Sequence, residues 1–413
     1  MNKKLVSLVL SPAVAITCFC GCGKKTSYKP LKDEDDTVYT IGMVSSVSEN
    51  DDLKKGFEDA VSDTFGKGHY KFVNATCSSK NDTASIQSLL DQGAQLILTE
   101  DWKSLVASYT LTQQASDDKD KTPVVSTGVN DIAAALGIEY SDEDNKTTGV
   151  NVTGVTPSPG VSSKLSELIE TVKKPKRVGI IYSPENRDAV KENRLLEEYL
   201  SQAGIGYREF ILPTSAYKSL MKDSAEAEAI KKSDDMDPTV PQISDDFAGS
   251  LFQIANDSQI LDWEKKARRS LKNASSSKII KTAVQQCDAL FISSGFSAGT
   301  VQKITRAARN ADLVTFGSDD TAGRYSLITL WADPYDSGYQ AGEMVYQILV
   351  NGQNPGDMPI ASQSEASFHK LYNGSYAEVL GLTFPKSFIE YSSFMASYEP
   401  GEGTEKVSDE EEN

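Results

Sequence analysis

Short polar and acidic side chains stand where each predicted strand ends. In an open α/β sheet the carboxyl ends of parallel strands meet at one edge, and ligands bind there beside helix N-termini. Any one of these residues alone is more typical of a helix cap or a turn. Their recurrence in both halves of the chain predicts a ligand-binding cleft, formed by Ser45, Ser46, Glu100, Asp101, Asn130, Asp131, Ser183, Ser294, Asp319 and Asp320.

One of these loops also resembles a catalytic motif. The segment Gly295-Phe-Ser-Ala-Gly299 follows a predicted strand and precedes a predicted helix, as a hydrolase nucleophile elbow does. Asp319 or Asp333 and then His369 follow in the chain order of the corresponding triad. However, nothing around His369 marks a loop after a last strand, and Gly/Ser loops are common at strand ends. A binding or capping loop is therefore favoured, and a serine hydrolase is the remote alternative.

Adjacent carboxylates and aromatic rings give two further candidate chemistries. The pair Asp319–Asp320 could act in acid/base catalysis, but neighbours on a loop usually point apart, which favours capping or ligand hydrogen bonds. Trp102, Phe296 and Trp331 lie beside strand ends, where a ring could stack on a ligand, although core packing is the commoner role. Only two histidines occur and no Cys-x-x-Cys or His-x-x-His spacing exists, so neither a metal nor a cofactor is expected.

The elements that must position these residues alternate between strand and helix. Strands are expected at 38–44, 69–76, 95–98 and 122–126, and again at 178–182, 207–212, 289–293, 313–316 and 326–332. Helical periodicity occupies the intervals, for example 189–203 and 300–310. The run at 178–182 is too short for a helix and lacks alternation, which is typical of a strand covered on both faces. This order predicts two α/β lobes, each with a doubly wound parallel sheet.

Three other segments fall outside that alternation. Residues 151–159 are turn-rich and are predicted to be the first passage between the lobes, followed by an amphipathic helix at 165–172. Residues 216–275 are charged and broken by prolines, which indicates an insertion on the second lobe without an assigned function. Residues 396–413 are acidic and are expected to be disordered.

Composition and the N-terminus restrict the class of protein. A length of 413 residues accommodates two ordinary domains, and a net charge of −17 argues against nucleic-acid or anionic-membrane binding. A basic start and a short apolar run predict an export signal over residues 1–22, followed by a polar tether at 23–36.

The cysteines fall into two groups. Gly21-Cys22 resembles a bacterial lipobox with Cys22 as the lipid acceptor, although Phe19 and Cys20 depart from the usual residues, and cleavage without lipidation is the alternative. Cys77 and Cys287 lie in different predicted lobes. A bridge between them would lock a hinge, so both are expected to be free and buried.

Five phrases in the right order resemble the substrate-binding lipoproteins of bacterial ABC transporters, in the type I branch with tryptophan- and tyrosine-binding members. They are Asn151-Val-Thr-Gly-Val155, Lys176-Arg-Val-Gly-Ile-Ile-Tyr-Ser-Pro184, Gly317-Ser-Asp-Asp320, Asp333-Pro-Tyr-Asp-Ser-Gly338 and Leu380-Gly-Leu-Thr-Phe-Pro385. The likeness covers roughly residues 37–395 apart from the insertion. It implies two lobes joined by three crossings, with residues 37–153 and 327–358 in the N-terminal lobe and 154–326 and 359–395 in the C-terminal lobe.

The resemblance also implies a set of ligand contacts. It adds Asp333 and Asn186 to the strand-end residues, and the segment 182–188 would form one jaw of the cleft. The chain departs from the family at Asn186-Arg187-Asp188, at Ser294-Gly295-Phe296 and at Glu100-Asp101-Trp102, so aromatic amino-acid specificity does not follow from the resemblance.

Together these features predict a lipid-anchored, extracytoplasmic solute-binding protein that serves an ABC permease, works as a monomer and performs no catalysis. The expected ligand is a small polar solute, first an amino acid or similar zwitterion, captured when the lobes close about the hinge. Its amine would bind acidic side chains, and its carboxylate would bind hydroxyls and helix N-termini. The alternatives are a sugar or nucleoside stacked on Trp102 or Phe296, and a ligand sensor without transport.

Overall fold

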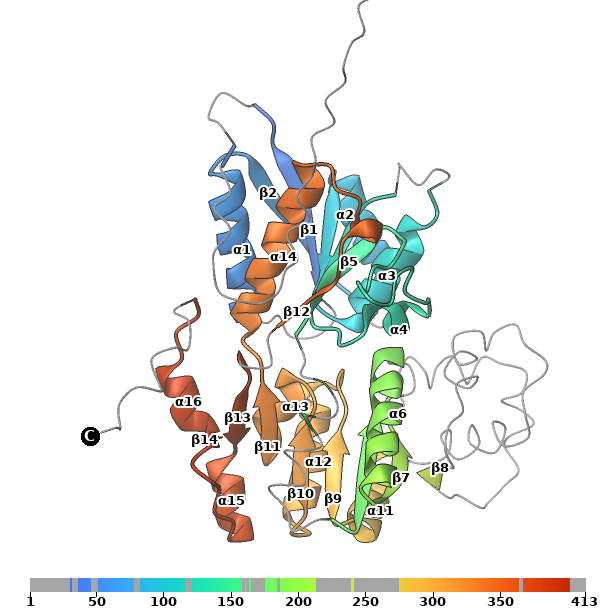
Figure 1. The fold of residues 1–413 in the computed structure, drawn as a ribbon, viewed down its shortest axis with the longest axis vertical. Helices are drawn as coiled ribbons and strands as arrows, with labels where there is room; N and C mark the ends of the chain where they lie inside the picture. Colours follow the sequence, from blue (N-terminus) through green and yellow to red (C-terminus); the bar gives the residue numbers. More distant parts are fainter. Residues whose placement is uncertain are drawn as a thin grey trace, which may run out of the picture.

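Two separate β-sheets, one in each lobe, organise the chain (Figure 1). The computed structural model describes residues 30–31, 36–45, 51–77, 82–115, 121–157, 160, 163–164, 175–183, 186–212, 239–240, 275–363 and 367–401. The predicted signal segment with Cys22, most of the tether, the helix expected at 165–172 and most of the insertion at 216–275 lie outside these residues.

The first lobe contains a six-stranded parallel sheet in the order β12-β5-β4-β3-β1-β2. Its strands are β1 (Tyr39–Ser45), β2 (Tyr70–Thr76), β3 (Leu96–Thr99), β4 (Val124–Ser126), β5 (Val152–Thr156) and β12 (Ala361–Ser362). The helices around it are α1 (Asp51–Phe65), α2 (Asp82–Asp91), α3 (Trp102–Thr112), α4 (Ile132–Leu136) and α14 (Pro334–Leu349). The central strand β3 is buried on both faces, which explains its unbroken apolar sequence.

Helices α1 and α14 pack closely on one face of this sheet (Figure 1). Glycines allow the approach, because a Cβ at Gly56 would lie 2.1 Å from the Tyr335 carbonyl oxygen, and one at Gly338 would lie 2.0 Å from that of Leu53. The two helices therefore meet almost backbone to backbone, and α14 belongs to the first lobe although it follows a strand of the second.

The second lobe contains an eight-stranded sheet in the order β14-β13-β11-β10-β9-β6-β7-β8. Its strands are β6 (Arg177–Tyr182), β7 (Gly206–Ile211), β8 (Thr239–Val240), β9 (Ala289–Ile292), β10 (Val314–Gly317), β11 (Ile328–Trp331), β13 (His369–Tyr372) and β14 (Ile389–Glu390). Pairing is parallel except where β8 joins β7 and β13 joins β11. The helices are α6 (Arg187–Gln202), α11 (Ser276–Gln286), α12 (Ala298–Arg309), α13 (Asp320–Tyr325), α15 (Gly374–Leu380) and α16 (Tyr391–Ser397).

The chain passes between the two sheets three times, after β5, after β11 and after β12. Two α/β lobes with parallel sheets and this connectivity confirm the predicted fold class, that of a type I periplasmic binding protein. The first passage begins after Thr156, three residues later than the boundary expected from the sequence, because residues 152–154 pair with β4 and residues 155–156 pair with β12.

Other boundaries in the sequence-based division were wrong. Strand β11 was expected in the first lobe, but Phe316 pairs with Ile328 in the second sheet, and Trp331 pairs with His369. Conversely, β12 was expected in the second lobe but pairs with β5 in the first. A short apolar strand carries no information on which of two sheets it joins, because the partner is chosen by tertiary packing.

Two further expectations at the C-terminal end also change. The turn-rich loop at 351–356, which its sequence makes a candidate for the second or third crossing, is not one. The short 3-10 helix η3 (Pro355–Asp357) packs on the first lobe, where the Gly149 amide donates to the Gly356 carbonyl. Residues 396–401, expected to begin a disordered tail, are ordered: the Tyr398 ring packs edge-on against Trp331 at a centroid distance of 5.0 Å. Cys77 and Cys287 are free and buried, one in each lobe.

Candidate functional site

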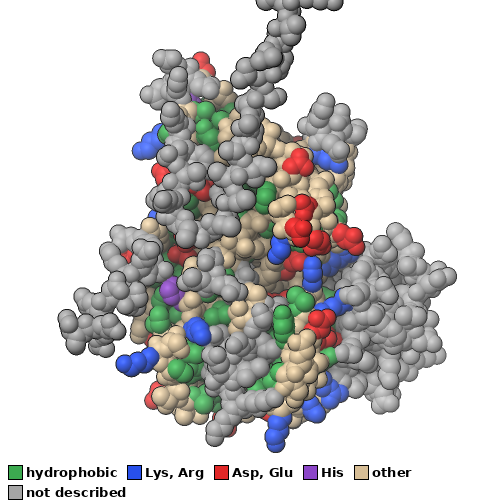
Figure 2. Space-filling model, in the orientation of Figure 1, with side chains coloured by type: hydrophobic (Ala, Val, Ile, Leu, Met, Phe, Trp, Pro, Cys, Tyr) green, Lys and Arg blue, Asp and Glu red, His purple; other side chains and the backbone are tan. Residues whose placement is uncertain are grey.

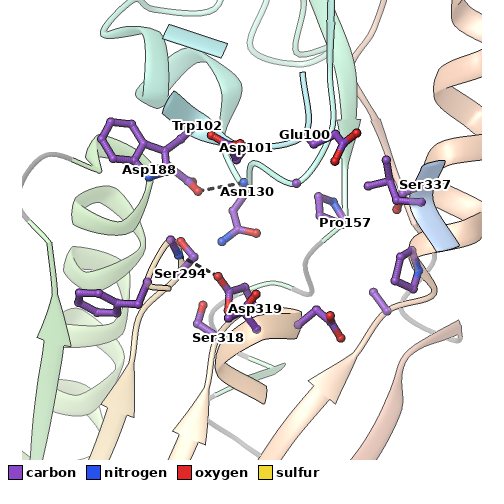
Figure 3. A pocket seen from close by; sticks show the side chains of 18 of the residues that line it. Glu100, Asp101, Trp102, Asn130, Pro157, Asp188, Ser294, Ser318, Asp319 and Ser337 are labelled. Atoms are coloured by element: carbon purple, nitrogen blue, oxygen red, sulfur yellow. Dashed lines mark hydrogen bonds between the residues drawn. The ribbon is translucent and has the colours of Figure 1, made fainter. Parts of the chain in front are cut away.

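A cleft of about 170 Å³ lies between the carboxyl ends of the strands of the two lobes (Figure 3). Its volume is comparable to the roughly 150 Å³ cavity that holds one benzene ring, so it suits a small molecule rather than a peptide. The first lobe contributes Ser45, Leu53, Glu100, Asp101, Trp102, Gly128, Asn130, Pro334 and Ser337. The second lobe and the crossings contribute Pro157, Asn186, Asp188, Ser294, Gly295, Phe296, Ser318, Asp319, Asp320, Thr321, Leu330, Trp331 and Ala332.

On the first-lobe side, the loop between β3 and α3 carries the acid Glu100, the helix cap Asp101 and the aromatic ring of Trp102. The Asp101 carboxylate accepts the amides of Lys103 and Ser104 at 2.9 and 3.0 Å and so closes the N-terminus of α3. This fixes the helix that presents Trp102. Gly128 lets the next loop approach, because a Cβ there would lie 2.3 Å from the Glu100 carbonyl oxygen and its φ is +69°.

On the second-lobe side, three loops are tied together by hydrogen bonds. The side-chain amide of Asn186 donates to the Ser294 carbonyl oxygen at 3.2 Å. The Gly295 amide donates to the Asp319 carboxylate at 2.8 Å, and the same carboxylate accepts the Ala322 amide at 2.7 Å to cap α13. The loops after β9 and β10 are therefore held as one unit.

The two lobes touch at the edge of this cleft. The backbone amide of Asn130 donates to the Asp188 carboxylate at 3.0 Å. This hydrogen bond links the loop after β4 to the first turn of α6. A Cβ at Gly295 would lie 2.9 Å from Trp102 Nε1, so the indole of one lobe rests on the glycine of the other.

Further contacts between the lobes join α4 to α6. Lys191 Nζ lies 2.5 Å from Asp131 Oδ2. Figure 2 shows acidic and basic side chains side by side on the face of the molecule where the two lobes meet. The Arg187 guanidinium fills the space that a side chain at Gly137 would need.

Most of the residues predicted from the sequence lie together in this cleft. Those that line it are Ser45, Glu100, Asp101, Trp102, Asn130, Asn186, Ser294, Phe296 and Asp319, and the strand-end candidates Asp320 and Trp331 join them. Ser46 lies outside the described residues.

Asp131, Ser183 and Asp333 were predicted as ligand contacts but do not line the cleft. The Asp131 carboxylate caps α4 and accepts the Tyr140 hydroxyl at 3.0 Å. Ser183 is buried. Asp333 caps α14 and accepts the Tyr398 hydroxyl, so helix capping draws its side chain away from the cleft.

The sequence analysis did not name Asp188 and Ser318 as individual ligand contacts, although Asp188 falls in the predicted jaw 182–188 and Ser318 stands beside the strand-end candidates Asp319 and Asp320. Asp188 is in the first turn of α6, and its position on the helix gives it a cleft-facing orientation that strand-end reasoning does not consider. Ser318 stands between Gly317 and Asp319, and its hydroxyl donates to the Glu192 carboxylate at 2.7 Å. Lys164 is 1 % exposed and reaches both groups from beneath, with its ammonium 2.9 Å from Ser318 Oγ.

The electrostatic environment of the cleft is acidic. Burial, followed by the neighbouring Glu192 charge, raises the pKa of Asp188 to about 8. Burial also raises the pKa of Asp319 to about 6, against the opposing effect of the two amides that it accepts. The pKa of Asp320 is raised by burial, although Arg324 at 3.8 Å opposes this. Among the described residues that line the cleft there is no lysine or arginine.

The other chemistries considered from the sequence lack the required geometry. Ser297 Oγ bonds Thr300 Oγ1 at 3.1 Å, whereas His369 lies on β13, beyond β10 and β11 from the strand that precedes Ser297, with its ring 4.8 Å from that of Phe394. The hydrolase triad is therefore not assembled. Within the described part of the chain, no three His, Cys, Asp or Glu side chains are placed to hold a metal ion.

Comparisons with known proteins agree with this architecture. A family model described as ABC transporter substrate binding protein matches residues 40–258. A conserved domain protein from Vibrio cholerae has a TM-score of 0.60 at 17 % identity over 85 % of this chain and 97 % of its own. An ABC domain from Streptococcus pneumoniae in complex with L-Trp has a TM-score of 0.59 at 17 % identity over 84 % of this chain and 96 % of its own.

A substrate-binding protein with adhesive properties from Clostridium difficile has a TM-score of 0.52 at 18 % identity, over 86 % of this chain and 99 % of its own. At sequence identities of 17–18 %, the likeness to these three structures shows the fold alone. Curated protein sequences gave no match. Among the helices that the structure describes, none combines the length and apolar character of a membrane span.

Proposed function

The chain belongs to the family of ABC transporter substrate-binding proteins, and from this premise we propose that it captures a small amine-bearing solute between its two lobes. Members of this family bind solutes on the extracytoplasmic side and work with a membrane permease. The protein is accordingly a binding protein and not an enzyme. An amino acid is the first example of the solute class.

The single observation that supports an amine is the composition of the cleft wall. Carboxylates reach it from both lobes, with Glu100 and Asp101 on one side and Asp188, Asp319 and Asp320 on the other. A solute ammonium would form charge-assisted hydrogen bonds with such groups. The rings of Trp102, Phe296 and Trp331 supply faces for an attached apolar or aromatic body, and also for a cation–π contact.

The mechanism that fits this arrangement is hinge closure about the three crossings. A solute held by groups from both lobes binds the closed form more tightly than the open form, and only that difference in affinity can shift the equilibrium. The permease would then recognise the closed form. The contacts between α4 and α6 show that the lobe surfaces are complementary on at least this side of the cleft.

Two other parts of the proposal rest on the sequence. We propose that Cys22 is lipidated and anchors a monomer to the outer face of the membrane, because Gly21-Cys22 ends the predicted export signal. Mass spectrometry of the membrane-extracted protein checks this. A diacylglyceryl mass on an N-terminal peptide beginning at Cys22 is expected, and an unmodified peptide would overturn the anchor.

A sugar or nucleoside is the second candidate, favoured by the aromatic rings in the cleft. The L-Trp in the Streptococcus pneumoniae structure does not choose between these classes, since the likeness at 17 % identity bears on the fold. A sensor without transport is distinguished by the genes beside it, where a permease and an ATPase indicate transport.

The experiment is a thermal-shift screen of the mature protein against amino acids, other amines, sugars and nucleosides. A bound solute stabilises the folded state by RT ln(1 + [L]/Kd), or about 2.7 kcal/mol at a hundredfold excess over Kd. An amine-bearing solute is expected to raise Tm. A rise with sugars or nucleosides alone would replace the proposal by the second candidate, and no rise with any solute would remove the support for solute capture.

A further inference from the structure

The cleft contains one buried acidic atom without a partner. Asp188 is 2 % exposed and lines the cleft, and its Oδ2 accepts the Asn130 amide at 3.0 Å. Its Oδ1 has no hydrogen-bond partner among the described residues. A buried carboxylate oxygen without a partner is costly, so its occurrence in a binding cleft indicates a group supplied by the ligand. Figure 3 shows Asp188 beside Trp102, opposite Glu100.

Lys164, the cation whose charge acts on Asp188, and Lys191 on the same helix already have partners. Lys164 pairs with Glu192 beneath the cleft, and Lys191 pairs with Asp131 at the lobe junction. Neither lines the cleft. The partner of Asp188 Oδ1 is therefore to be sought in the solute. Burial keeps this carboxyl protonated in the unliganded protein, and a solute ammonium would favour its ionised form and donate to Oδ1.

A solute carboxylate would be expected to bind at helix N-termini around the cleft. Apart from that of α12, the ones whose capping residues the structure describes are closed by the protein itself, and the residues that precede α1 lie outside the described part of the chain. Side chains cap α3, α6, α13 and α14. The caps are the carboxylates of Asp101, Asp319 and Asp333 and the side-chain amide of Asn186. The capping carboxylates would meet a solute carboxylate with like charge, whereas a neutral acceptor on the solute would suffice for the Asn130 side-chain amide, a buried donor at the cleft without a partner among the described residues. Helix α12 lacks a side-chain cap at Ser297, but the lining residues of that loop are Ser294, Gly295 and Phe296, which precede it.

We propose that the solute is a small organic amine without a free carboxylate, with its ammonium nitrogen bound to Asp188 Oδ1 and its apolar body beside Trp102. This inference rests on the proposed function and narrows it, because it separates amines from the amino acids that carry the same side chain. It assigns Asp188 the role of specificity determinant. The Asn130 bond to Oδ2 holds the carboxylate so that Oδ1 is available to the solute.

The direct test compares each amino acid with its decarboxylated amine by isothermal titration calorimetry on the mature protein at pH 8. The pairs are tryptophan and tryptamine, tyrosine and tyramine, lysine and cadaverine, and ornithine and putrescine. In every pair of which a member binds, the amine is expected to bind at least tenfold more tightly than the amino acid, since the two differ only in the carboxylate. An amino acid that binds as tightly as its amine or more tightly would overturn the inference and leave the proposed function intact. If no member of any pair binds, the inference fails, and the thermal-shift screen decides the proposed function separately.

A variant tests the role of Asp188. Asp188→Asn keeps an oxygen for the Asn130 amide but removes the charge, and the matched control Glu198→Gln removes one charge from the exposed face of the same helix. For the amine that binds the wild type most tightly, Asp188→Asn is expected to weaken binding roughly tenfold to a hundredfold, as for loss of a charged hydrogen bond. Glu198→Gln is expected to bind as the wild type does. Equal amine affinity in Asp188→Asn and wild type would overturn the assignment.

Discussion

Replacing Asp188 by asparagine is expected to weaken solute binding. In the unliganded protein, the free energy of unfolding of the variant is expected to rise relative to that of the wild type as the pH rises. The pKa of the Asp188 carboxyl is raised to about 8 in the folded protein by burial, and an unfolded aspartate has a pKa of about 3.9. A carboxyl whose folded pKa is raised contributes its full stability below pH ~4 and loses it as the pH rises through about 8. Between these limits unfolding releases one proton.

The magnitude follows from that proton. Stability should fall by about 1.4 kcal/mol per pH unit, or about 2.7 kcal/mol between pH 5 and pH 7, from this group alone. The asparagine variant does not have this loss. The charged groups that face Asp188 are Glu192 and Asp131, which raise its pKa, and Lys164, which lowers it. All three are retained in the variant, so their own titration largely cancels in the comparison.

The assay is urea unfolding of the wild type, Asp188→Asn and Glu198→Gln at pH 5, 6 and 7. The difference in free energy of unfolding between Asp188→Asn and wild type should widen in favour of the variant by about 1.4 kcal/mol per pH unit. Glu198→Gln, which is exposed, should follow the wild type. Parallel pH dependences for all three proteins would refute the reasoning that Asp188 is held protonated by burial.

Three other substitutions have defined outcomes. Lys164→Met leaves the Glu192 carboxylate buried and unpaired and should cost about 3–5 kcal/mol in urea unfolding, and a cost below about 1 kcal/mol would contradict the buried pair. Tyr398→Phe removes the hydroxyl that donates to Asp333 and should lower the free energy of unfolding by about 1–3 kcal/mol, whereas an unchanged value would show that this contact is not formed. Gly295→Ala places a methyl group against the indole that rests on it, at a φ of +88°, and should lower both Tm and solute affinity; wild-type values in both would contradict that contact.

The sequence was sufficient to predict the two-lobed fold and most of the cleft. Apolar runs such as 178–182 mark buried parallel strands, and polar residues at strand ends converge because the carboxyl ends of such strands meet at one edge. This reasoning found Asn130, Ser294 and Asp319 from local pattern alone.

The remaining features depend on tertiary contacts that local pattern does not encode. Strand β11 could have joined either sheet, and only pairing with β10 places it in the second. Asp333 has the residue type expected of a ligand contact, but its side chain caps α14. Asp188 is in a helix rather than at a strand end, so its exposure to the cleft depends on how α6 is rotated against the first lobe.

The most direct test of the account is a crystal structure of the mature protein with its bound solute. The account predicts a solute enclosed between the lobes, with its ammonium nitrogen within hydrogen-bond distance of Asp188 and its apolar body against Trp102. A solute bound outside the cleft, or one in the cleft that turns a neutral or anionic group toward Asp188, would contradict it.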